Sequence, residues 1–220
     1  MDLFDIIGPI MVGPSSSHTA GVVRIGNVVR KILDAEPKDI VVKFHGSFST
    51  TYKGHGSDKA IIGGIMGFKA DDPRIRGSLE VAKSSGIAYS FETITLKNAH
   101  PNSIVVQVKD KNGNGLKVIG ESVGGGNIVI RRINDTVVEL TGEYDTIITN
   151  HHDEPGVVSL VANVLAFNQI NIANMRVFRS AKGGGAIMVI ETDGIPDKGL
   201  AKTLAALPSI MWTSIIRGGK

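Results

Sequence analysis

The segment GPSSSHTAG, residues 13–21, contains three serines, a histidine and a threonine without interruption. A hydroxyl-rich turn at the start of a helix offers backbone N–H groups, the positive end of the helix dipole and side-chain donors, which together suit a carboxylate or another anion. The segment therefore predicts an anion-binding turn formed by Ser15, Ser16, Ser17 and Thr19, or a plain helix start capped by Ser17 or Thr19. It does not match the G-x-S-x-G elbow of serine hydrolases, and sequence neighbours rarely face each other as a catalytic triad requires.

A second glycine-rich segment, KGHGSDKA, spans residues 53–60. Gly54 and Gly56 allow the backbone to bend around His55, and Ser57 or Asp58 can cap the helix that follows. The pattern lacks the G-x-x-x-x-G-K-[ST] arrangement of a phosphate-binding loop. The segment is therefore either a functional loop or a structural turn.

A further histidine, His100, lies in the segment NAHPNS. Pro101 favours an extended conformation of the residue before it, just ahead of a strand expected from Ile104. A loop histidine of this kind is either a surface residue or a group that exchanges protons near neutral pH. His45 lies within an expected strand and is left outside the predicted site.

Runs rich in β-branched residues predict six strands in the first part of the chain, some joined by the hairpin turns Asn112-Gly113 and Asn134-Asp135. They are expected at Ile40–Phe44, Ala88–Leu96, Ile104–Val108, Gly115–Ile119, Asn127–Ile133 and Thr136–Leu140. Apolar residues at three-four spacing predict a helix at Ala20–Leu33, and a second helix is expected at Arg74–Ser84. Gly63 and Gly64 weaken a helix and indicate close packing against another element.

The pattern changes near Tyr144, from which strand, helix, strand, strand, helix and strand follow one another. Their expected bounds are 144–151, 157–167, 171–179, 186–191, 197–206 and 210–216. This βαββαβ order is the ferredoxin-like plan. The sequence therefore predicts an α/β (α+β) protein with a mixed α/β domain at residues 1–141 and a ferredoxin-like domain at residues 144–220.

Composition narrows the classes of function. The 220 residues include no cysteine, so the chain has no thiolate for a disulfide or an iron–sulfur cluster. A formal net charge of +3 with scattered basic residues argues against nucleic-acid binding. The opening stretch lacks the basic region of a signal peptide and no apolar run is long enough to span a bilayer, so no membrane association and a cytoplasmic location are expected.

The segments FDIIGPIMVGPSSSHTAG, YKGHGSDKA, HPN and GESVGGGNI resemble, in order and spacing, the β chain of bacterial iron–sulfur-dependent L-serine dehydratases. The later segment NHHDEPGVVSLVANVLAFNQINIANM resembles an ACT domain, a regulatory module that commonly binds amino acids. The resemblance implies that the first domain is similar to an allosteric substrate-binding domain. It also implies an α-chain partner whose cysteines hold a [4Fe-4S] cluster, and conversion of L-serine to pyruvate and ammonia by the pair.

The resemblance implies two groups of site residues in the first domain. The candidates for the base that takes up the substrate proton are His18, Lys53, His55 and Asp58. The expected substrate contacts are Ser15, Ser16, Ser17, Thr19, His100 and Asn102. Two other interpretations stay open: a stand-alone amino-acid-sensing regulatory protein without catalysis, and a purely structural partner.

In the second domain, similarity to serine-regulated ACT domains of biosynthetic dehydrogenases implies effector contacts at His151, Asp153 and Asn171. Asp153 stands where those modules have an asparagine. A carboxylate there repels the carboxylate of an amino acid but can receive its ammonium group. The alternative is that this module only drives self-association, since a fold does not fix a ligand.

Overall fold

The computed structural model describes residues 10–194 and 198–218, which divide into two units at the turn between Asn134 and Asp135. The helical elements of the first unit are a π-helical turn at Ser16–Ala20, α2 (Gly21–Leu33), α3 (Ser47–Thr51), α4 (Ser57–Ile65), a 3₁₀ turn at Pro73–Gly77 and α5 (Ser78–Ser84). Its strands are β1 (Pro37–His45), β2 (Ala88–Ile94), β3 (Ser103–Asp110), β4 (Gly115–Gly124) and β5 (Asn127–Ile133). Among these described residues, no helix is both long and apolar enough to cross a membrane.

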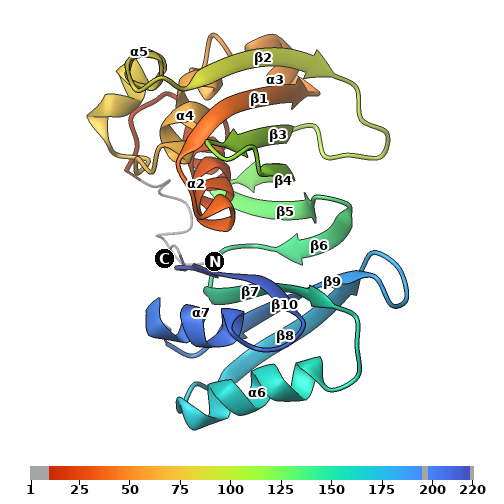
Figure 1. The fold of residues 1–220 in the computed structure, drawn as a ribbon. Coiled ribbons are helices and arrows are strands. Elements are labelled where there is room, and N and C mark those ends of the chain that lie inside the picture. The colour runs from red at the N-terminus through yellow and green to blue at the C-terminus, as the bar shows by residue number, and fades with distance from the viewer. Residues whose placement is uncertain (1–9, 195–197, 219–220) are drawn as a thin grey trace. The chain divides into compact units, whose positions relative to one another are not determined.

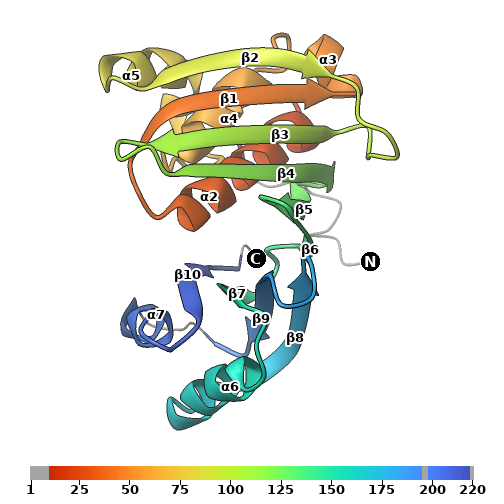
Figure 2. The ribbon, with the colours of Figure 1, turned by 45° about the vertical axis from the view of Figure 1, so that its right-hand side comes forward.

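The strands of the first unit are hydrogen-bonded in the order β2-β1-β3-β4-β5. β1 runs parallel to β2, whereas the β1–β3, β3–β4 and β4–β5 pairs are antiparallel. Alternate residues of β1 point into the core, where Ile40, Val42 and Phe44 are at most 1% exposed. Helices α2 and α4 lie on that face of the sheet (Figure 2).

The two helices α2 and α4 approach each other closely through glycines. A Cβ atom added to Gly64 would lie 2.3 Å from the carbonyl oxygen of Val23, and one added to Gly26 would lie 2.7 Å from that of Ile61. No side chain fits between backbones at such distances. The close packing expected from the glycines of the 60–66 stretch is therefore confirmed, and it fixes the two helices that begin at the glycine-rich motifs.

The second unit begins with β6 and then follows the βαββαβ order. Its elements are β6 (Thr136–Leu140), β7 (Asp145–His152), α6 (Val157–Phe167), β8 (Ile172–Arg179), β9 (Gly185–Thr192), α7 (Lys198–Ala205) and β10 (Ile210–Ile216). The four-stranded sheet has the order β10-β7-β9-β8 with antiparallel neighbours. Helices α6 and α7 contribute Val161, Leu165, Leu200 and Leu204 to a core shared with Ile147 of β7. The mixed α/β class and the ferredoxin-like plan are confirmed (Figure 1).

Several expected boundaries differ from the structure. The strand expected at Ile40–Phe44 spans Pro37–His45, and residues 47–51 form the unpredicted helix α3. Strand β4 continues five residues beyond Ile119, to Gly124. The expected start of the last helix, Asp197, lies outside the described residues. Strand β8 begins at Ile172, so Asn171 precedes it.

Candidate functional site

The opening motif forms the first turns of a helix that continues into α2. Ser15 is the N-cap: its backbone is extended, and its Oγ accepts a hydrogen bond from the backbone N–H of His18 at 3.2 Å. The expected caps, Ser17 and Thr19, were wrong because the helical conformation already starts at Ser16. The turn is π-helical, with the N–H of Gly21 bonded to the carbonyl of Ser16. Such turns are frequent at functional sites.

The structure brings His18 and His55 together. Their ring centroids are 4.7 Å apart, and the His18 ring packs edge-on against fully buried Phe48 at 4.8 Å. Nε2 of His18 and Nδ1 of His55 are both buried, and neither has a hydrogen-bond partner within residues 10–194 and 198–218. Buried polar atoms are normally paired, so two orphan nitrogens in one cluster indicate a place where another molecule binds.

The protonation of His18 follows from this packing. Burial lowers the pKa of His18 below its ordinary value, and the charge of the neighbouring His55 lowers it further. Removal from water disfavours the charged imidazolium, and a second imidazolium beside it repels it. His18 is therefore neutral at neutral pH and able to accept a proton.

The remaining base candidates lie in the second motif. Asp58 is half-buried, and burial raises its pKa despite a hydrogen bond from the N–H of Lys59 and the charges of Lys59 and Lys53. Lys53 is exposed, with Nζ 5.8 Å from the centroid of the Tyr52 ring. The expected cap of α4 was wrong: the N-cap is Gly56, in the left-handed conformation at φ 70°, without a side-chain bond.

Buried hydroxyl groups of the two motifs form hydrogen bonds that link one motif to the other. Ser57, fully buried, donates from Oγ to the carbonyl of His18 at 2.8 Å. Thr19 is 1% exposed, and its Oγ1 lies 3.5 Å from the carbonyl of His55. Ser16 and Ser17 are half-buried on the opening turn. The structure thus connects the two glycine-rich motifs directly, as the fold must if both serve one site.

The HPN segment is anchored to the same region. The N–H of Asn102 donates to Nδ1 of His100 at 3.1 Å, and Ser47 Oγ donates to Oδ1 of Asn102. The carbonyl of Asn102 accepts from the N–H of Ser122 at 3.0 Å, and Oγ of Ser122 donates to the carbonyl of Ser17 at 2.8 Å. Ser122 therefore ties the HPN segment to the opening turn.

Sequence reasoning missed the residues that assemble these loops, namely Ser47, Phe48, Glu121 and Ser122. Glu121 is 8% exposed, accepts from Arg131 at 2.8 Å and lies 3.4 Å from the N–H of His100. Glu121 and Ser122 belong to the segment GESVGGGNI, which does not say what its serine contacts, and no motif contained Ser47 or Phe48. The partner of Ser122 lies 105 residues away in the sequence.

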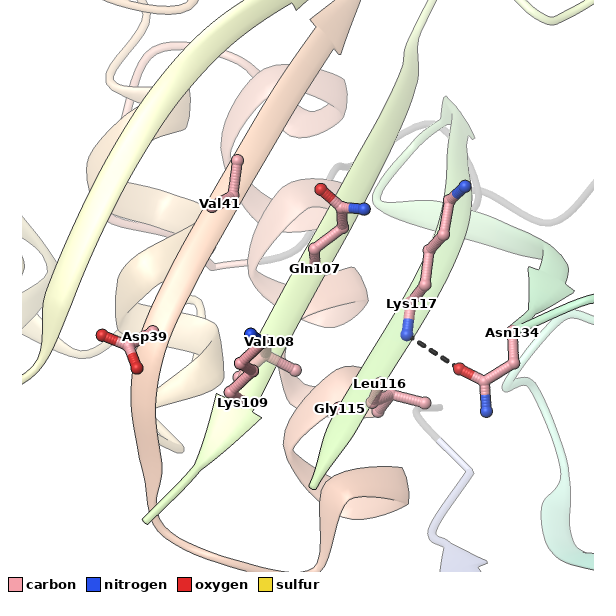
Figure 3. Close-up of a pocket in the computed structure, with 9 residues that line it drawn as sticks. All are labelled: Asp39, Val41, Gln107, Val108, Lys109, Gly115, Leu116, Lys117 and Asn134. Carbon is pink, nitrogen blue, oxygen red and sulfur yellow. Dashed lines mark hydrogen bonds between the residues drawn. The ribbon is translucent and has the colours of Figure 1, made fainter. Parts of the chain in front are cut away.

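A cavity of about 530 Å³ on the sheet contains none of the predicted site residues (Figure 3). Gln107 and Lys117 belong to the sheet face that the cavity occupies, and the N–H of Lys117 donates to Oδ1 of Asn134 at 2.9 Å. The cavity holds no cluster of orphan buried groups like that of the two histidines. We therefore place the candidate active site at His18 and His55.

The second unit contains a cavity of about 560 Å³ beside the loop that follows β7. Its lining includes His151, Asp153, Arg179 and Lys182. His151 is 2% exposed; its Nδ1 donates to the carbonyl of His152 at 2.8 Å, and its Nε2 has no partner among the residues that the structure describes. Asp153 is paired with Arg179 at 3.2 Å and accepts from the N–H of Gly183.

Asn171 does not join His151 and Asp153 in this unit. It precedes β8, whereas Arg179, which lines the cavity, ends that strand. Its Nδ2 donates to Oδ2 of Asp193 at 2.6 Å. Within one chain, Asn171 thus lies at the opposite end of β8 from the cavity that contains His151 and Asp153, and its role as an effector contact stays a prediction.

Comparisons with known proteins identify a family for each part of the chain. Residues 1–132 match the family model described as serine dehydratase beta chain, and residues 146–209 match the ACT domain model. A probable L-serine dehydratase beta chain of Bacillus subtilis (strain 168) is 44% identical over 95% of this chain and 94% of its own length. The L-serine dehydratase beta chain of Peptoniphilus asaccharolyticus is 42% identical over 86% of each chain.

A further relative is longer than this chain. The L-serine dehydratase of Haemophilus influenzae (strain ATCC 51907 / DSM 11121 / KW20 / Rd) is 29% identical over 59% of this chain, which corresponds to 33% of that protein. The resemblance inferred from the sequence motifs is thus confirmed. The chain belongs to the serine dehydratase β-chain family, with an ACT domain in its second unit.

Proposed function

We propose that this chain is the β subunit of an iron–sulfur-dependent L-serine dehydratase and that His18, with His55 beside it, serves the removal of the substrate's Cα proton. The observation that supports this role is the pair of buried, unpartnered nitrogens, Nε2 of His18 and Nδ1 of His55, on rings 4.7 Å apart. The two rings come from separate motifs that the fold draws together. Burial keeps the pKa of His18 low, so its ring is ready to receive a proton.

The reaction is an α,β-elimination. The Cα–H bond of L-serine breaks, its electron pair forms a double bond to Cβ, the hydroxyl leaves, and the enamine that results hydrolyses to pyruvate and ammonia. Nδ1 of His18 lies 3.3 Å from Ser15 Oγ. When Nδ1–H donates a hydrogen bond to Ser15 Oγ, the lone pair of Nε2 is free to take up the Cα proton. The half-buried Ser16 and Ser17, with the loop of His100 and Asn102, are proposed to contact the substrate.

The [4Fe-4S] cluster of the family does not fit the residues of this chain. The sequence has no cysteine, and the described residues contain no group of three or more His, Asp or Glu side chains arranged to hold a metal ion. We therefore assign the cluster to the α chain, with which this chain forms the complete enzyme. The present chain supplies the histidine pair and the hydroxyl-rich turn.

The proposal predicts that the chain purified alone contains no iron and releases no pyruvate from L-serine, because it has no thiolate for a cluster. Anaerobic co-expression with the α chain is expected to give an iron-containing complex that releases pyruvate, whereas the α chain alone releases little. Iron content and pyruvate release are measured on all three preparations. An unchanged activity of the α chain with and without this chain would instead favour a stand-alone amino-acid-sensing protein.

A second role is proposed for the cavity of the ACT unit, which the unpartnered Nε2 of buried His151 favours. Because Nδ1 of His151 donates to a carbonyl, Nε2 carries the lone pair and can accept from the ammonium or hydroxyl of an amino acid such as L-serine. Lys182, at the same cavity, suits the ligand's carboxylate. Asp153 orients Arg179 beside it.

For this role, L-serine is expected to raise the melting temperature of the full chain, because a ligand of the folded state stabilises it. His151→Ala should abolish the shift. His152→Ala is the matched control, since His152 is the next residue and is exposed. An equal increase in melting temperature in both variants would show that His151 does not bind the effector.

Self-association through the ACT unit is part of the same proposal. Strand β8 lies at the edge of its sheet, and helix α6 exposes Leu160 and Phe167 at 40% and 88%. An edge strand and exposed apolar side chains favour contact with a second copy.

A further inference from the structure

Two consecutive carbonyl groups of the opening turn are each held by a buried serine hydroxyl from another element. Oγ of Ser122 in β4 donates to the carbonyl of Ser17, and Oγ of Ser57 in α4 donates to the carbonyl of His18, both at 2.8 Å. Both serines are 0% exposed. The two bonds approach the backbone of one residue pair from two separate elements of the fold.

The turn that they hold departs from regular α-helix geometry. Residues 16–20 are π-helical, and the N–H of Gly21 reaches back five residues to the carbonyl of Ser16. Isolated π turns are rare and persist where the surrounding structure supports them. The two serine hydroxyls are such supports, because each satisfies a carbonyl at the start of the helix with a donor from outside it.

Strand β4 packs closely against the opening turn at Ser122. A Cβ atom added to Gly21 would lie 2.2 Å from Oγ of Ser122. The backbone N–H of Ser122 also donates to the carbonyl of Asn102 at 3.0 Å. Ser122 therefore fixes the opening turn with its side chain and the HPN segment with its backbone.

The position of the His18 ring depends on the backbone that these serines hold. The ring lies between Phe48 and His55, at centroid distances of 4.8 and 4.7 Å. A shift of the backbone at residues 17–18 moves Nε2 with it. Misplacement of a reacting group by about 1 Å can lower a rate by about 100-fold.

We propose that Ser57 and Ser122 are positioning residues of the dehydratase reaction, which hold the carbonyls of His18 and Ser17 and so fix the direction of the His18 ring. This inference rests on the proposed function, because it assigns the two serines a role through His18. Neither serine is required to touch the substrate.

The test compares Ser57→Ala and Ser122→Ala with Ser78→Ala in the α–β complex. Ser78 is a matched control: it is 0% exposed, and its Oγ donates to the carbonyl of Lys59 at 2.7 Å, in the same type of bond. Each variant loses one buried hydrogen bond, so all three should melt at similarly reduced temperatures. Only Ser57→Ala and Ser122→Ala are expected to lower kcat, by about tenfold or more.

A second measurement does not depend on the partner or on turnover. The imidazole of His18 is titrated by NMR in the full chain without the α chain. Loosening of the turn admits water to the ring, so the pKa of His18 should rise toward its ordinary value in Ser57→Ala and Ser122→Ala. It should stay low in Ser78→Ala. The groups that face the ring are His55, Phe48 and Ser15, which all three variants retain.

The outcomes separate this inference from the function on which it rests. Normal turnover in a His18→Gln enzyme would overturn the proposed function itself. An inactive His18→Gln enzyme, together with Ser57→Ala and Ser122→Ala variants that match Ser78→Ala in kcat and in the His18 titration, would overturn the positioning role alone.

Discussion

Replacing His18 by glutamine is expected to lower the kcat of the α–β complex by about 100-fold or more, because general base catalysis contributes on the order of 10² to 10⁴ in rate. Glutamine keeps the approximate size and polarity of the side chain but cannot accept a proton near neutral pH. The substitution should leave the melting temperature and co-purification with the α chain nearly unchanged. Pyruvate release, melting and co-purification are measured on the same samples.

His45→Gln is the control for the effect of losing an imidazole. His45 is half-buried in the same unit, and its Nδ1 accepts from the N–H of Leu96 at 3.2 Å. The pH profile adds a second criterion. Since His55 helps to hold the pKa of His18 low, His55→Gln should move the acid limb of kcat/KM to higher pH. Equal activity in His18→Gln and His45→Gln would exclude His18 as the base.

The second large effect is expected at the contact between α2 and α4. Gly64→Ala should destabilise the chain by about 1–3 kcal/mol or more, because the new Cβ would lie 2.3 Å from the carbonyl oxygen of Val23 and the two backbones must separate. Both helices begin at site motifs, so activity should fall as well. Urea unfolding of the full chain measures the free energy, and pyruvate release by the complex measures the activity.

The neighbouring Gly63→Ala is the matched control. It has the same gain in helix propensity in the same helix, but its Cβ would meet only side-chain atoms, at 3.3 Å or more. We expect little loss of stability there. A similar loss of stability in both variants would show that an added methyl group anywhere in this part of α4 is destabilising. The close backbone contact with α2 would then not be the cause.

Local patterns in the sequence predicted much of the fold. The bounds expected for β5, β6, α6 and β10 agree with the structure, because alternation of β-branched residues and clear turn signals mark them. The helix at residues 47–51 was missed, since SFSTT has no helical apolar pattern and only one of its side chains, Phe48, enters the core. Short elements of this kind are set by tertiary packing.

The motifs of the candidate site were predictable from the sequence, but the contacts between them were not. The sequence indicated the opening turn and the loop around His55 as functional segments. It did not show that Ser15 caps the turn, that Ser57 binds the carbonyl of His18, or that Ser122 links two loops. These contacts depend on the paths of β4 and α4 through space. For the same reason, the sequence did not show that Asn171 and His151 lie at opposite ends of β8 within one chain.

The bond between Ser122 and Ser17 also has a consequence for the timing of synthesis. The two residues are 105 positions apart, so the opening turn leaves the ribosome long before the strand that holds it. At about 5–20 residues per second, the delay amounts to roughly 5–20 s. During that interval the first residues of the site emerge without one of their supports. Productive docking of a nascent β chain onto its α chain is therefore expected only after β4 has been made.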